Sequence, residues 1–139
     1  MELFNKKESN QLDFLNHQIN SEPSKESVTN QNKKIEKILI VDTETTGLDE
    51  NKDEVIEIGS ILFDVSHKCV LSQVSFLFPV NNNEAEYVNG IPAKVTNISQ
   101  PWQEGLNFFL KLVDYSDFIV SHNVEFDKKW FGKGRLPKI

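Results

Sequence analysis

The sequence has few of the residues that build cross-linked or membrane-bound proteins. Cysteine occurs once in 139 residues, at Cys69, which excludes an internal disulfide framework and a thiolate zinc cluster. No apolar run approaches the roughly 18 residues that a membrane span needs. The first residues, from Met1 onward, lack the basic region and apolar core of a secretory signal. These absences predict a soluble cytoplasmic protein that does not contact a membrane.

Positive charge is also scarce. The chain has 15 Lys and Arg residues against 21 Asp and Glu residues, a net charge of −6. Proteins that coat nucleic acid without regard to sequence are usually basic, so the charge balance disfavours that role. It leaves a metal-dependent nuclease open, because such an active site is itself acidic until cations bind.

The first 34 residues are poor in apolar side chains. From Asn16 to Lys34 the chain is almost entirely Asn, Ser, Gln, Glu and Lys, with Pro23 in the middle. Such a stretch buries too little apolar surface to offset the entropy lost on ordering. We therefore expect a disordered polar tail over residues 1–34, followed by one domain over residues 35–139.

Beyond the tail, the hydrophobic pattern predicts alternating strands and helices. Ile38 to Val41 is a continuous apolar run, typical of a strand in the middle of a sheet that is covered on both faces. The periodicity predicts further strands over 55–65, 70–78 and 118–120, and helices over 102–113 and 123–131. The order β-β-β-α-β-α predicts an α/β fold with a mixed sheet and flanking helices.

The first acidic motif lies at the end of the buried strand and reads Asp-Thr-Glu-Thr-Thr-Gly from Asp42 to Gly47. Residues two apart in a strand share a face, so Asp42 and Glu44 point to the same side. Two adjacent carboxylates repel each other, and a divalent cation removes that conflict. Oxygen ligands without His or Cys beside them suit magnesium or manganese.

The second acidic motif follows the strand over 118–120 and opens the last helix. Asn123 can cap this helix, and Asp127 falls in its first turn, where the positive helix end favours the ionised carboxyl. Taken alone, the first motif also fits a polar loop at a strand end, and the second also fits an ordinary helix cap. The two in this order, each at a strand end, are far more specific.

Together the motifs resemble the DEDD family of 3′→5′ exonucleases, which includes the proofreading subunit of the bacterial replicative polymerase. The resemblance covers residues 35–131 and implies a ribonuclease H-like sheet. The residues that match the two family motifs are Asp42 and Glu44 in the first, and His122, Asn123, Phe126 and Asp127 in the second.

The resemblance implies hydrolysis of terminal phosphodiesters at a nucleic-acid 3′ end by two Mg²⁺ or Mn²⁺ ions, with DNA favoured over RNA. It implies that Asp42 bridges both ions, that Glu44 binds the ion that activates water, and that Asp127 binds the other. The positions implied to contact substrate are Thr45, Leu48, His122 and Asn123.

The chain departs from the family pattern after Asp127. The family's third motif supplies a fourth carboxylate and a His or Tyr that orients water, but no Asp, Glu, His or Tyr follows Asp127. We therefore find no general base, and expect a C-terminally truncated fold that lacks its last strand and closing helices. The strand over 118–120 would become an exposed edge. Asn89 occupies a position that is His in many relatives, and Glu57 could be an extra site acid or a structural hydrogen-bonding residue.

Three functions stay open at this point. The chain can be an active exonuclease, a catalytically inactive remnant, or a nucleic-acid-binding fragment that needs a second chain to supply the third motif. The expected partners are a nucleic-acid 3′ end and either a polymerase or a complementing chain.

Overall fold

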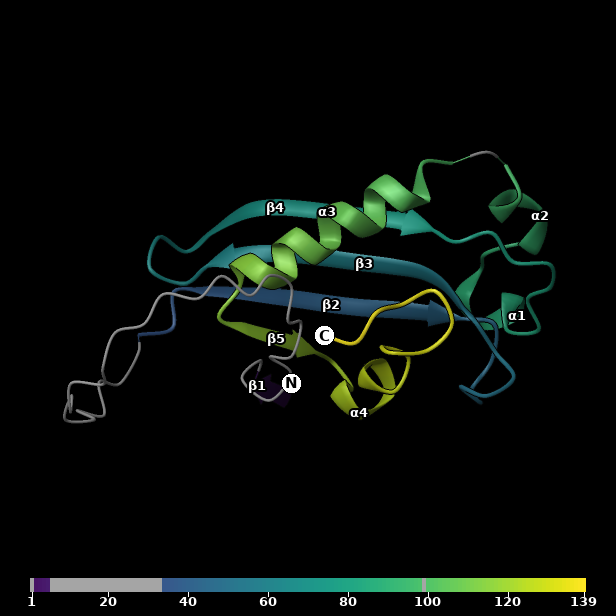
Figure 1. Cartoon of the computed structure of the whole chain (residues 1–139), viewed down its shortest axis with the longest axis horizontal. Helices are drawn as coiled ribbons and strands as arrows, with labels where there is room; N and C mark the ends of the chain where they lie inside the picture. The colour runs from purple at the N-terminus through teal and green to yellow at the C-terminus, as the bar shows by residue number, and fades with distance from the viewer. Residues whose placement is uncertain (1, 6–33, 99) are drawn as a thin grey trace, which may run out of the picture.

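The computed structural model describes residues 2–5, 34–98 and 100–139. Five strands in this part form one sheet in the order β1-β5-β2-β3-β4. In chain order they are β1 (Glu2–Asn5), β2 (Lys37–Thr45), β3 (Val55–Asp64), β4 (Cys69–Leu77) and β5 (Phe118–Ser121). Strand β5 runs parallel to β2, and the other neighbouring pairs are antiparallel. The sheet is therefore mixed, as predicted, with β2 at its centre (Figure 1).

The structure describes four helices beside this sheet. They are α1 (Glu86–Asn89), α2 (Ala93–Thr96), α3 (Trp102–Tyr115) and α4 (Val124–Lys128). Helix α3 crosses one face of the sheet, α1 and α2 lie together at one end of it, and α4 follows the end of β5 (Figure 1). None of the helices in the described ranges is long and apolar enough to cross a bilayer.

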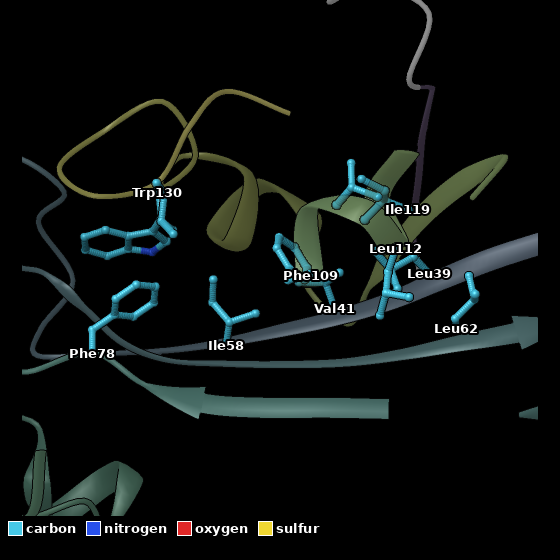
Figure 2. Packing of buried hydrophobic residues seen from close by; sticks show 11 residues of the cluster. Leu39, Val41, Ile58, Leu62, Phe78, Phe109, Leu112, Ile119 and Trp130 are labelled. Atoms are coloured by element: carbon cyan, nitrogen blue, oxygen red, sulfur yellow. The ribbon is translucent and has the colours of Figure 1, made fainter. Parts of the chain in front are cut away.

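The hydrophobic core lies between α3 and the sheet face that it covers. Alternate residues of β2 and β3 point into it, among them Leu39, Val41 and Ile58, while the residues between them are less buried. Figure 2 shows Phe109 of α3 above this face, with Leu112 beside Leu39. The period of two in the strands thus meets the apolar stripe of α3.

The C-terminal segment completes this core. The spacing of Phe126 and Trp130 predicts that both pack inward, and Trp130 is indeed only 2% exposed. The cationic end of the chain was expected to be a solvated coil, but Leu136 within it is only 4% exposed and belongs to the core cluster with Trp130. Trp130 lies over Phe78 in Figure 2, on the same side of the sheet as Phe109. Helix α4 ends at Lys128, earlier than predicted, because the chain must turn back to place these side chains against the sheet.

The β5 edge differs from its expectation. Within the predicted disordered tail, β1 pairs antiparallel with β5, from Glu2 opposite Ser121 to Asn5 opposite Phe118. The backbone groups of β5 are therefore bonded on both sides, by β1 and by β2, and β5 is not a bare edge. Residues 6–33, the rest of the predicted tail, lie outside the described residues.

Two smaller expectations also change. The Asn-Gly pair at 89–90 and Pro92 predict a loop-rich segment over 81–99, and this segment contains the short helices α1 and α2. We expected both faces of β2 to be covered by other elements. The face opposite α3 is covered only in part, since Ile38 and Ile40 on it are half-buried. An apolar run therefore identified the central strand correctly, but it did not determine how completely each face is covered.

Replacement of Phe109 by Ala should destabilise the domain by about 3–5 kcal/mol, because its ring is 0% exposed and stacks on Phe131 with centroids 5.9 Å apart. Phe108→Ala, at a neighbour on the same helix that is 43% exposed, is the matched control and should cost far less. Urea unfolding followed by circular dichroism measures both. Equal losses for the two variants would show that the face of α3 has been assigned wrongly.

Candidate active site

Both carboxylates of the first motif lie within the last four residues of β2. The strand continues through Thr45, so alternation places Thr43 and Thr45 on the buried face, and Asp42 and Glu44 on the opposite, more open face. The predicted pairing of Asp42 with Glu44 on one side of the strand is therefore confirmed. Ile40 precedes them on this same face.

Asp127 reaches this strand from α4. Its Oδ1 accepts hydrogen bonds from the backbone N–H of Thr43, at 3.0 Å, and from the Thr43 hydroxyl, at 2.7 Å. Both bonds are buried and join residues 84 positions apart. Thr43 lies between Asp42 and Glu44 in the strand, but its side chain is on the opposite, buried face, so these bonds hold Asp127 at the strand edge on the buried side. Asp127 is still near enough for its charge to raise the pKa of Asp42 and Glu44.

The local sequence explains why Asp127 points that way. The side chain of Asn123 accepts from the Phe126 N–H at 3.4 Å and caps α4, as predicted. Strand β5 stops at Ser121, while β2 runs on past it. The backbone of Thr43 has therefore no strand partner on that side, and the Asp127 carboxylate accepts its N–H instead.

The carboxylates interact unfavourably as a group. Burial raises the pKa of Asp42 first, and the nearby charges of Asp127 and Glu57 raise it further, while His122 acts in the opposite direction. The pKa of Glu44 is raised by burial first and then by Asp42, Glu57 and Asp127. Bound cations would relieve this repulsion, and the group therefore has the electrostatics of a cation site.

Glu57 is the acid whose place the sequence left open. It lies on β3 directly opposite Glu44, and its charge acts on both acids of the first motif. Its Oε1 accepts a short hydrogen bond from the Ser75 hydroxyl of β4. Like charges directly across a strand pair are destabilising. The signal for Glu57 was available only from strand register, which the motif pattern does not contain.

The loop after the first motif holds the expected substrate-contacting positions. Leu48 is 76% exposed, whereas Thr45 is buried and its hydroxyl donates to the Gly47 carbonyl at 2.6 Å. A Cβ at Gly47 would overlap the Asp53 carboxylate, so glycine at this position lets the Asp53 side chain lie against the backbone of residue 47. Contacts of Thr45 and Leu48 with a nucleotide stay predictions.

Asn89 has a structural part in this arrangement. Its side-chain amide donates to the Thr45 carbonyl at 3.0 Å, and its Oδ1 accepts from the side chain of Asn83 at 2.9 Å. The end of α1 is thereby bonded to the end of β2. His122 is exposed beside Asp42, and contacts of His122 and Asn123 with substrate stay predictions.

A hollow of about 360 Å³ opens on the same face beside Asp42. Gly59, directly opposite Asp42 on β3, leaves this space because it has no side chain, and Ile61 and Gln73 line the far side. Among the residues that the structure describes, no three His, Cys, Asp or Glu side chains are already arranged as ligands of one metal ion. The donors nevertheless fit a hard divalent cation in type, since they are all carboxylate oxygens.

Comparison with known proteins agrees with the fold. The nuclease domain of 3′hExo, described as a DEDDh family member bound to rAMP, superposes with a TM-score of 0.54 at 12% identity, over 70% of this chain and 57% of that one. This likeness supports the fold predicted from the sequence, a mixed sheet with flanking helices. The present chain spans little more than half of that nuclease domain.

Two further solved structures have lower TM-scores. Cell-death related nuclease 4 has a TM-score of 0.46 at 20% identity, over 58% of this chain and 31% of that one. A full-length 3′-exonuclease has a TM-score of 0.49 at 15% identity, over 68% of this chain and 36% of that one. No curated protein sequence matches the chain.

The family follows from the sequence match. Residues 39–133 match the model of the RNase_T family, which is described as exonuclease. Because this match covers more than half of the 139 residues, the chain belongs to the RNase_T exonuclease family. The membership expected from the two acidic motifs is therefore confirmed.

Replacement of Asp42 by Asn should raise the free energy of unfolding at neutral pH in the absence of divalent cations. A carboxyl whose pKa is raised in the folded state favours folding most below its unfolded pKa, and this contribution is lost as pH rises through the folded pKa. The gain should therefore vanish below about pH 4.

Urea unfolding in EDTA at pH 7 and at pH 3.5 measures this effect, with Glu84→Gln, at an exposed loop position, as the control. A lower stability of Asp42→Asn at pH 7 would contradict the repulsion that we describe.

Thr43→Val should cost about 1.5–3 kcal/mol of unfolding free energy, because it removes one of two buried hydrogen bonds to the Asp127 carboxylate. Thr43→Ser keeps the hydroxyl and is the matched control. Denaturant titration of both variants decides the point, and a Val variant as stable as the Ser variant would show that the hydroxyl bond contributes nothing.

Proposed function

We propose that this chain is a metal-dependent 3′→5′ exonuclease domain that hydrolyses the terminal phosphodiester of a nucleic-acid strand. The observation that carries the proposal is that Asp127, bonded to Thr43, lies near enough to Asp42 and Glu44 for its charge to raise the pKa of both carboxyls. Family membership supports the same reaction class. The proposal extends this membership to activity, substrate and mechanism.

Asp42, Glu44 and Asp127 are the residues that would hold the cations, which we expect to be two Mg²⁺ or Mn²⁺ ions. Two such ions supply an activated water and charge stabilisation for the leaving 3′ oxygen. Both hydrogen bonds of Asp127 end on Oδ1, so Oδ2 is the atom through which Asp127 would bind a cation. The raised pKa values of Asp42 and Glu44 support this assignment, because bound cations would offset the repulsion among these acids.

The reaction replaces one phosphorus–oxygen bond by another. A water oxygen bonds to the last phosphorus, the bond from that phosphorus to the 3′ oxygen of the preceding nucleotide breaks, and this oxygen takes up a proton. The products are a nucleoside 5′-monophosphate and a strand shortened by one nucleotide. Among the residues after Asp127 the chain offers no His, Tyr or carboxylate to accept the proton from water.

The terminal nucleotide would lie against the loop that follows β2. Leu48 is 76% exposed there and offers an apolar contact surface for a base or a sugar. The Thr45 hydroxyl is bonded to the Gly47 carbonyl, so this side chain shapes the turn that presents Leu48. His122 and Asn123, at the start of α4, complete the proposed substrate-contacting set.

We favour DNA as the substrate because the Thr-Glu-Thr-Thr-Gly sequence at 43–47 resembles the proofreading branch of the family. RNA is the alternative, since the nuclease domain of 3′hExo is described bound to rAMP. A polymerase partner or a complementing chain stays a prediction.

A second candidate is a nucleic-acid-binding module that does not hydrolyse the strand by itself. It is supported by the lack, among the described residues, of three side chains already arranged around one metal ion. This module would bind a labelled strand without shortening it.

Labelled single-stranded DNA and RNA incubated with Mg²⁺ or Mn²⁺ should lose nucleotides stepwise from the 3′ end. EDTA should stop the reaction, and Asp42→Asn or Asp127→Asn should slow it by about 100-fold or more. Glu125→Gln, in the same short helix as Asp127 but exposed, is the matched control and should retain the rate.

Binding of the strand without any shortening would favour the second candidate. Equal rates for Asp127→Asn and Glu125→Gln would contradict the proposed site.

A further inference from the structure

A second connection joins the two motif segments on the outer side of α4. Lys129, just past the helix, donates from Nζ to the Leu48 carbonyl at 2.6 Å, and the same Nζ lies 3.7 Å from Glu50 Oε2. Lys133 Nζ lies 3.3 Å from Glu50 Oε1 and donates to Asn51 Oδ1 at 3.3 Å. We call these contacts the lysine clasp.

The lysine clasp differs from an ordinary surface ion pair. The ammonium of Lys129 lies 4.8 Å from the ring centroid of Phe126 and 5.2 Å from that of Trp130, and the Lys129 side chain is 28% exposed. Trp130 is itself fixed in the core. Exposed ion pairs between mobile side chains contribute little to stability. Here the aromatic rings hold the Lys129 ammonium in place, so less side-chain entropy is lost when it binds the loop.

The loop that the clasp holds is braced within itself. The Asp49 N–H donates to Asp53 Oδ2 at 2.9 Å, and the N–H groups of Lys52 and Asp53 donate to the Asp49 carbonyl at 2.9 and 2.8 Å. These bonds connect the two halves of the loop to each other. The clasp therefore sets the position of the whole loop, including the exposed side chain of Leu48, relative to α4.

The clasp begins one residue after the helix that carries Asp127. Asp127 binds Thr43 on the inner side, and Lys129, two residues later, binds the Leu48 carbonyl on the outer side. Helix α4 is thus attached both to β2 and to the loop that follows β2. A shift of the loop away from α4 would separate Leu48 from Asp127.

We propose that Lys129 and Lys133 are positioning residues, which hold the loop over 46–54 so that Leu48 packs on the terminal nucleotide while Asp127 faces its phosphate. This inference rests on the proposed exonuclease function. The lysines act through the loop and do not touch the reacting atoms. Their contribution is electrostatic and decreases as the salt concentration rises.

The first test is hydrogen exchange on the protein without substrate. Lys129→Met should speed exchange of the amides over 46–54 by about tenfold, as the loss of one charge-assisted hydrogen bond implies. Exchange in α3 should stay unchanged. Lys129→Arg should keep exchange slow, and Lys111→Met, at an exposed position on α3, is the charge-matched control. Unchanged exchange in the loop, or equal acceleration in α3, would overturn the clasp.

The second test is kinetic and separates the clasp from the proposed reaction. Lys129→Met should raise KM for a single strand about tenfold with kcat little changed, and Lys129→Arg should restore KM. An unchanged KM in an active enzyme would sink the positioning role. A wild-type protein that shows no hydrolysis, with a loop loosened by Lys129→Met, would refute the function and leave the clasp established.

Discussion

The pair of hydrogen bonds from Thr43 to the Asp127 carboxylate is the contact on which the site depends. It joins a central strand to a helix of five residues that could not be stable alone. It is possible because β5 ends before β2 does, which leaves the Thr43 N–H in need of an acceptor. The packing of Trp130 against the sheet and the lysine clasp hold the same short helix from its other end.

The same contact creates an electrostatic conflict. It places Asp127 near Asp42 and Glu44. Burial, and then the negative charges of the neighbouring carboxylates, raise the pKa values of Asp42 and Glu44. Without bound cations this repulsion opposes folding, and cations held at the proposed site would offset it. The hollow left by Gly59 lies beside these acids and keeps the face open.

Local patterns in the sequence predicted much of the central sheet and of the first acidic motif. The apolar run from Ile38 to Val41 predicted the central strand, and alternation placed Asp42 and Glu44 together, because a strand has a period of two. Three features were beyond such patterns. Glu57 needed the register of β3 against β2, β1 needed a partner 119 residues away in Ser121, and the burial of Leu136 needed a chain reversal after Lys128.

The sequence by itself determined the strands β2 to β5, the helix α3, the two acidic motifs and the family, since each depends on local spacing or on a short pattern of residues within this chain. Only the tertiary structure decided that Asp127 binds Thr43, that Glu57 faces Glu44, and that Lys129 holds the Leu48 loop. These pairings join distant segments, and their geometry follows from where strands end and how the core packs, which no local pattern encodes.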